Sequence, residues 1–190
     1  LKQRQFQYCP SLQILFLSYN YISHIQSFSF KGLKRLSLID LTRNPLKLIH
    51  PYAFYDMQCL PRLNLTLMQI SQIHRKAFLG LRHMSWLDLS RNNIRTLYST
   101  IFNGLDELLY IDISHNNFHV DVTVDSPFKR LTKLRILMTS HSYLCCFALS
   151  TKCIPTLHDH SQCFDLLPGK SLRSLVWEKL AICFQIKCCC

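Results

Sequence analysis

Leucine-type residues return along the chain at an interval of 24 positions, and a polar residue follows each group of them at a fixed offset. Asparagine fills that polar position as Asn20, Asn44, Asn92 and Asn116, and Met68 stands where the period predicts one more. Each group contains an apolar–x–apolar triplet, and alternation with a period of two is typical of a short strand buried on one face. The triplets predict five strands: Leu15–Leu17, Ile39–Leu41, Leu63–Leu65, Leu87–Leu89 and Ile111–Ile113.

Phenylalanine repeats in the second half of each unit. Phe30, Phe54, Phe78 and Phe102 stand ten residues after the asparagine position, and Phe128 stands twelve after Asn116. With the leucines this completes the pattern L-x-x-L-x-L-x-x-N-x-L of leucine-rich repeats, and a degraded sixth copy runs from Leu134 to Leu144. The pattern predicts an α/β-type leucine-rich-repeat solenoid. We expect a curved parallel β-sheet, with the phenylalanine column buried behind it on the convex side.

The methionine at position 68 predicts a local defect. An asparagine side chain at the end of each strand is able to bond backbone groups of adjacent turns that would otherwise be buried without partners. Met68 has no such amide. We therefore expect a weakened connection at the third repeat.

The register also divides the chain. Residues 1–9 fit the end of an earlier repeat, so the repeats run over 1–144, followed by a cysteine-rich cap at 145–168 and a poorly ordered, juxtamembrane-like tail at 169–190. Eight of the ten cysteines follow residue 144. A disulfide-bonded cap is the extracellular way to seal the last edge of a solenoid.

Four cysteines are candidates for that cap: Cys145, Cys146, Cys153 and Cys163. Adjacent cysteines do not readily bridge each other, which leaves two pairings of the first two with the last two. An alternative is a zinc site completed by His141, His158 or His160, but the spacing lacks the C-x2-C pairs of common zinc modules. We predict disulfides and no metal.

The segment from Tyr143 to Trp177 carries a more specific signal. It holds Y-L-C-C-F-A-L-S-T-K-C-I-P, then C-F-D-L-L and L-R-S-L-V-W. These motifs resemble the segment that links the repeats to the first membrane helix in relaxin-family peptide receptors, which are leucine-rich-repeat-containing G-protein-coupled receptors. The resemblance is specific over about the last fifth of the chain and loose over the repeats. It implies an ectodomain on the extracellular side of the plasma membrane.

The chain departs from that family after Trp177. Glu178, Lys179, Gln185 and Lys187 interrupt the apolar helix that a receptor would have there, and a spanning helix needs about 20 predominantly apolar residues. We therefore expect a fragment truncated at the first membrane helix, unable to signal through a G protein by itself and secreted if the truncation is real. Membrane attachment would come only from a missing downstream domain.

The exposed residues of the predicted strands supply a candidate ligand site. One column contains Asp40, Asp88 and Asp112, and the neighbouring column contains Trp86 and Tyr110. Asp88 and Asp112 lie on adjacent strands, where like charges are mildly unfavourable until a cation joins them. The resemblance implies that such acidic pairs take arginines of a relaxin- or insulin-like peptide hormone beside an apolar contact. We predict these five residues as hormone contacts, although aspartate is also an ordinary residue at this position of the repeat.

Two features complicate that hypothesis. The formal net charge is +11, but most of the excess lies off the strands, at Arg43, Lys47, Arg75, Lys76, Arg82, Arg95, Lys129, Arg130 and Lys133, where it is either a solvated face or a surface for sulfated glycans. Asn64 heads the only N-glycosylation sequon, Asn64-Leu65-Thr66, in the middle of the predicted ligand face. Either the sequon is unused or the ligand binds to one side of it.

Catalytic motifs are absent from the sequence. It contains no G-x-S-x-G, no Walker loop and no paired metal-binding histidines, so we predict no enzyme and no cofactor. We also expect no nucleic-acid partner. The alternatives to a hormone-binding ectodomain are an extracellular adhesion or matrix protein that binds another protein or a sulfated glycan, and an intracellular scaffold with reduced cysteines.

Overall fold

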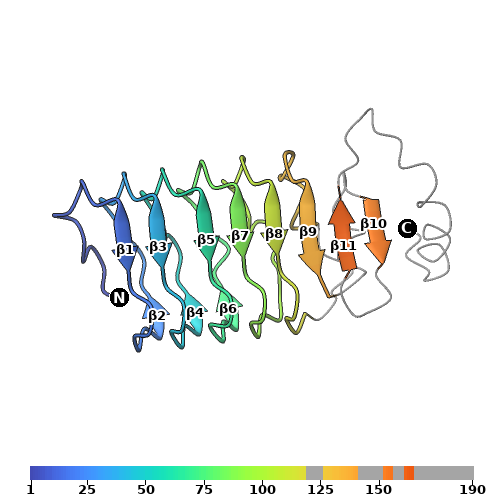
Figure 1. Cartoon of the computed structure of the whole chain (residues 1–190), viewed down its shortest axis with the longest axis horizontal. Helices are drawn as coiled ribbons and strands as arrows, with labels where there is room; N and C mark the ends of the chain where they lie inside the picture. The colour runs from blue at the N-terminus through green and yellow to red at the C-terminus, as the bar shows by residue number, and fades with distance from the viewer. Residues whose placement is uncertain (119–125, 141–151, 156–160, 165–190) are drawn as a thin grey trace.

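The computed structural model describes residues 1–118, 126–140, 152–155 and 161–164. Its main strands stand side by side in a row along the long axis of the molecule, one for each repeat (Figure 1). The main strands are β1 (Ile14–Phe16), β3 (Leu38–Asp40), β5 (Arg62–Asn64), β7 (Trp86–Asp88), β8 (Tyr110–Asp112) and β9 (Ile136–Thr139). A second row of two-residue strands, β2 (His24–Ile25), β4 (Leu48–Ile49) and β6 (Gln72–Ile73), forms its own parallel sheet.

The main strands are parallel from β1 to β9. The five strands that the sequence predicted, all but β9, each begin and end one residue before the predicted bounds. Their central residues are in register: Leu63 lies opposite Leu87, Leu87 opposite Ile111, and Ile111 opposite Leu137. These central side chains are buried, so the residues on either side of them face solvent. We call that solvent-facing surface of the main strands the inner face. The predicted parallel solenoid is confirmed.

The phenylalanine column forms a continuous stack behind the main strands. Phe30, Phe54 and Phe78 are fully buried, and the rings of Phe54 and Phe78 are 6.0 Å apart with only 8° between their planes. The same stacking continues to Phe6 on one side and Phe128 on the other, at centroid distances between 5.7 and 6.3 Å. Each ring contributes roughly 1.5–3 kcal/mol by burial, so the column is a main source of stability.

The asparagines join successive repeats as expected. Asn92 donates from Nδ2 to the carbonyl of Leu65 at 2.7 Å, and its Oδ1 accepts from the backbone of Met68 at 3.1 Å and Ile70 at 2.9 Å. Asn44 and Asn116 repeat this arrangement two repeats earlier and one repeat later, with small variations. A single amide thus satisfies backbone groups of the preceding turn that would otherwise be buried without partners.

The sheet is interrupted at the third repeat. β1 pairs only with β3, and the larger sheet begins at β5, so β3 and β5 are not paired. Met68 is fully buried but supplies no amide, and the Leu46 N–H bonds instead to the carbonyl of Asn44 at 2.9 Å. Pro61 adds a second cause, because proline has no N–H where Ser37 and Ser85 each donate to the preceding repeat at 2.9 Å. The predicted weak connection is confirmed, and Pro61 is a contributor that the prediction missed.

Turns and the short strands β2, β4 and β6, rather than helices, form the rest of the repeats in the part of the chain that is described. One turn position adopts a left-handed backbone in five successive repeats, with φ between 52° and 59°, at Tyr19, Arg43, Leu67, Arg91 and His115. None of these residues is glycine, although this conformation disfavours side chains with a Cβ atom. The α/β label of the predicted fold class thus has no helical counterpart in the described repeats.

Two further strands extend the large sheet past β9. β11 (Ser161–Phe164) pairs antiparallel with β9, and β10 (Lys152–Pro155) pairs antiparallel with β11. In this register Cys153 lies opposite Cys163 along the backbone. Cys145 and Cys146 lie outside the described residues, as does the predicted tail at 169–190, so the disulfide-bonded cap stays a prediction.

Candidate functional site

The inner face is most distinctive where β7 and β8 lie side by side. Trp86 and Tyr110 occupy equivalent positions of the two strands and stack with ring centroids 5.4 Å apart and 6° between their planes. Both side chains are partly exposed. They therefore offer a flat aromatic surface to solvent, which is the kind of anchor that dominates many protein interfaces.

Two carboxylates lie beside that surface. Asp88 and Asp112 follow the aromatic residues by two positions on the same strands, and they are register partners. Each commits one oxygen to its own turn: Asp88 Oδ1 accepts from the Ser90 N–H, and Asp112 Oδ1 accepts from the Ser114 N–H, both at 2.8 Å. The structure thus brings together Trp86, Tyr110, Asp88 and Asp112 as the sequence predicted.

The same turn bond recurs along the column, so it also has a structural role. Asp40 Oδ1 accepts from the Thr42 N–H at 2.9 Å, and Asn64 Oδ1 accepts from the Thr66 N–H at 3.0 Å. The uncharged amide of Asn64 thus accepts the same turn hydrogen bond as the aspartates, at a similar distance. The negative charge of Asp88 and Asp112 is therefore not required by the turn, and the serines that complete it were not singled out from the sequence.

The electrostatics of the pair favour a cationic partner. Partial burial raises the pKa of Asp88 above its ordinary value despite its hydrogen bonds with Ser90, and the charge of Asp112 raises it further. Burial also raises the pKa of Tyr110 to about 12, with contributions from Asp112 and Asp88. A positive group bound here would relieve this repulsion.

Asp40 is separated from the pair. It belongs to β3, on the other side of the break between β3 and β5, and its pKa is lowered below the ordinary value by hydrogen bonds from Thr42 and Ser18, which outweigh the opposing effect of burial. Its exposed neighbours are apolar, with Ile14 51%, Phe16 68% and Leu38 43% exposed. The inner face therefore has an apolar region on β1 and β3 and an aromatic and acidic region on β7 and β8.

Arg62 and Asn64 on β5 lie between the two regions, with Arg62 in register with Trp86. The sequon at Asn64 is built into this strand, where Leu65 is fully buried and Thr66 Oγ1 bonds to the Ser90 carbonyl at 3.1 Å. Glycosylation of Asn64 stays a prediction. A glycan there would stand beside Asp88, its register partner.

Two other kinds of feature are absent from the described segments. No group of three or more histidine, cysteine, aspartate or glutamate side chains suited to a metal occurs there. The same segments contain no helix long and apolar enough to cross a membrane. Cys9 and Cys59 are free and exposed.

Comparison with known families agrees with the geometry. The leucine rich repeat family model matches residues 10–67 and 60–118, which together span more than half of the chain. The chain belongs to the leucine-rich-repeat family. No curated protein matches this leucine-rich-repeat chain.

Two of the solved structures similar to this leucine-rich-repeat protein contain Toll and TLR13. A Drosophila Toll–Spatzle complex aligns over 70% of this chain and 18% of the Toll chain, with a TM-score of 0.57 and 18% identity. A TLR13–ssRNA13 complex aligns over 72% of this chain and 26% of its own, with a TM-score of 0.47 and 26% identity. The chain thus spans about a fifth to a quarter of the length of these two chains, and the likeness to the Toll structure concerns the fold alone.

Proposed function

We propose that this chain is a peptide-binding segment of a receptor ectodomain and that its ligand is a relaxin- or insulin-like peptide hormone with a basic contact residue. The observation that carries the proposal is the stacked Trp86–Tyr110 pair directly beside the register-matched Asp88 and Asp112. An arginine of the ligand would lie against the carboxylates while its apolar neighbours cover the rings.

The negative charges of Asp88 and Asp112 contribute little to the stability of the fold but favour the binding of a cationic ligand. Asn64 makes the same turn bond without a charge, while the raised pKa of Asp88 shows that its charge is disfavoured in the free protein. A bound guanidinium would pair with both carboxylates and remove that penalty. The resemblance of the segment Tyr143–Trp177 to relaxin-family receptors supports the class of ligand.

The fold of the chain is compatible with this role. Leucine-rich-repeat proteins commonly use the exposed face of their sheet for binding, and the Toll structure of the same fold is a complex with another molecule, Spatzle. We place the site on the extracellular side of the plasma membrane for the parent receptor. The sulfated-glycan alternative concerns a different surface.

The test is a binding titration with relaxin-family hormones and the variants Asp88→Asn and Asp112→Asn. Both variants keep the oxygen that caps the turn, so they remove charge without removing structure. Each should weaken binding by roughly 1.5–3 kcal/mol, the contribution of a charge-assisted hydrogen bond. Trp86→Ala should weaken binding by a similar amount, since it removes half of the aromatic surface.

Asp106→Asn is the matched control, because Asp106 is exposed and lies off the inner face. Asp56 is another aspartate off the inner face, but it would be a poorer control because its carboxylate accepts a hydrogen bond from the Gly32 N–H at 3.3 Å. Equal and negligible effects of Asp88→Asn, Asp112→Asn and Asp106→Asn would remove the hormone site from this surface.

A further inference from the structure

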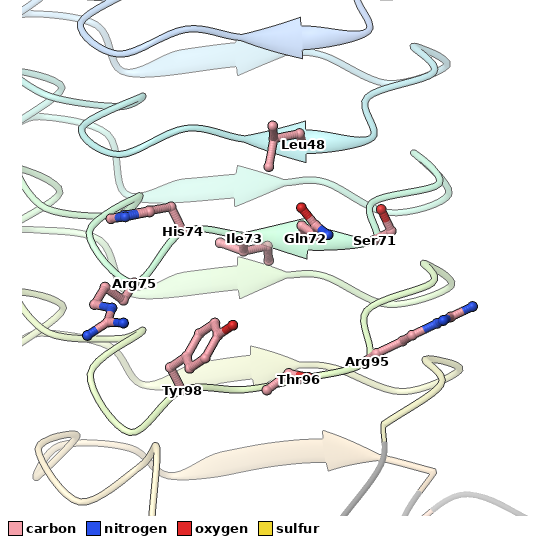
Figure 2. Close-up of a pocket in the computed structure, with 9 residues that line it drawn as sticks. All are labelled: Leu48, Ser71, Gln72, Ile73, His74, Arg75, Arg95, Thr96 and Tyr98. Atoms are coloured by element: carbon pink, nitrogen blue, oxygen red, sulfur yellow. The ribbon is translucent and has the colours of Figure 1, made fainter.

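A second surface of the molecule carries unpaired positive charge around a cavity. The cavity has a volume of about 390 Å³ and lies between β6 and the segment Arg95–Tyr98 of the next repeat (Figure 2). A neighbouring cavity of about 620 Å³ shares Ser71 with it. We call the two cavities together the basic hollow.

The hollow exists because the sheet of short strands ends at β6. β4 and β6 are joined on either side of their paired residues by bonds from Ser71 N to the Lys47 carbonyl at 3.1 Å and from His74 N to the Ile49 carbonyl at 3.0 Å. No equivalent backbone bonds join β6 to the segment Arg95–Tyr98 within the described repeats. The next turn therefore stands away from β6 and leaves space between the two.

Four permanent cations line the basic hollow: Lys47, Arg75, Arg91 and Arg95. No acidic residue lines either cavity. The one ion pair in the described part of the chain is remote, between Lys133 and Glu107 at 2.7 Å. These cations consequently have no carboxylate partner within the described repeats.

The period of the solenoid sets the positions of these charges. Lys47, Ser71 and Arg95 occupy the same position of three successive repeats, so the small Ser71 leaves a gap between two cations. Two hydrogen-bonded steps of about 4.8 Å would separate the Lys47 and Arg95 backbones by about 10 Å, and the actual separation is larger because Arg95 stands away from β6. Figure 2 shows Arg75 and Arg95 at opposite ends of the cavity, with Gln72 and Thr96 between them.

The local field is positive enough to affect a neutral base. His74 lines the cavity, and its pKa is lowered by burial and then by the charges of Arg75, Lys76 and His50. Its Nδ1 already accepts from the Lys76 N–H at 3.1 Å. An anion in the hollow would be stabilised by the same field.

We propose that the basic hollow binds a sulfated glycan chain. A polyanion is required to reach cations spread over two cavities, and arginine forks match the oxygens of sulfate groups. Gln72, Thr96 and Ser71 offer polar partners for sugar hydroxyls. Binding of single-stranded nucleic acid uses successive stacking aromatics, whereas the hollow has one exposed ring, Tyr98, and Arg75 already lies 5.6 Å from its centre.

The experiment is calorimetric titration of the full chain with a heparin octasaccharide. Lys47→Ala/Arg95→Ala should weaken binding at least about tenfold, since two charge-assisted contacts are lost. The control is Lys34→Ala/Arg82→Ala, which also removes one lysine and one arginine from exposed positions two repeats apart. These two residues come before the main strands of their repeats, whereas Lys47 and Arg95 come after them. The control variant should weaken binding less than about threefold, because solvent screens the effect of exposed charges that lie away from the basic hollow.

A charge inserted between the cations gives an independent test. Ser71→Glu places a carboxylate between Lys47 and Arg95 and should abolish binding, whereas Gln58→Glu makes the same change between Lys34 and Arg82 and should not. Circular dichroism confirms that each variant is folded. Equal losses in the two double variants, equal binding of desulfated heparin, or tighter binding of single-stranded RNA or anionic vesicles would each overturn the proposal.

Discussion

Replacing Asn92 by alanine is predicted to destabilise the chain far more than replacing Asn20, although both occupy the same position of the repeat. Asn92 bonds to the preceding repeat, whereas Asn20 donates from Nδ2 to the carbonyls of Leu17 and Ser18 in its own repeat, at 3.0 and 2.9 Å. The pair of variants therefore separates the bonds that join repeats from those within one repeat.

The magnitude follows from the groups that lose their partner. Asn92→Ala leaves three backbone groups without one: the N–H groups of Met68 and Ile70, both in fully buried residues, and the carbonyl of Leu65. The Leu89 carbonyl keeps its bond from Asn116. At about 1–3 kcal/mol for each buried unsatisfied group, partly relieved by relaxation, we expect a loss of roughly 3–5 kcal/mol.

Asn20→Ala leaves almost nothing unsatisfied. The Leu17 carbonyl keeps its bond from Asn44 at 2.8 Å, and Ser18 is accessible to water. The expected loss is less than about 1 kcal/mol. Equilibrium urea unfolding followed by circular dichroism measures both, with the m-value checked for constancy.

Asn92→Asp isolates the acceptor role, because the aspartate retains oxygens for the two N–H groups but has no amide to donate to Leu65. It should fall between the wild type and Asn92→Ala. If Asn92→Ala and Asn20→Ala destabilise the chain to the same extent, the asparagines do not join the repeats and the reasoning fails.

Three further predictions follow from other parts of the structure. The Leu41 amide faces the break between β3 and β5 and has no backbone acceptor in the described repeats, whereas the Leu89 amide donates to the Asp112 carbonyl at 2.7 Å. The Leu41 amide should therefore exchange with solvent at least about tenfold faster than the Leu89 amide. Equal protection of the two amides in hydrogen-exchange experiments would contradict the break. Leu67→Asn should stabilise the chain by about 0.5–1 kcal/mol in urea unfolding, because Leu67 is 55% exposed and holds a left-handed φ of 57° that asparagine tolerates better. A loss of stability in the variant would show that the packing of the Leu67 side chain outweighs the backbone strain. Asp88→Asn should raise the melting temperature at neutral pH, because the pKa of Asp88 is raised in the folded state and its ionisation therefore disfavours folding. This advantage should shrink as the pH falls from the raised folded-state pKa to the ordinary aspartate value of 3.8, below which Asp88 is protonated in both states; a pH-independent difference would refute the electrostatic cause.

The period of the sequence determined the solenoid. A spacing of 24 residues that holds for leucines, asparagines and phenylalanines leaves one arrangement in which all of them are buried or bonded, so Phe54 and Phe78 were correctly predicted to stack behind the strands. The same regularity predicted that Trp86, Tyr110, Asp88 and Asp112 would meet on one face. Local exceptions were visible where a residue lacks the required group, as Met68 does.

Tertiary structure decided what depends on contacts between particular repeats. The sheet breaks in the repeat where the missing N–H of Pro61 coincides with the missing amide of Met68, and the periodicity alone does not show that two strands separate there. The basic hollow arises because the segment Arg95–Tyr98 does not pair with β6, although its sequence resembles the segments that do. Periodicity fixes which residues are neighbours, because it sets their order along the solenoid. The distances at which neighbours pair, separate or leave a cavity depend on packing in three dimensions.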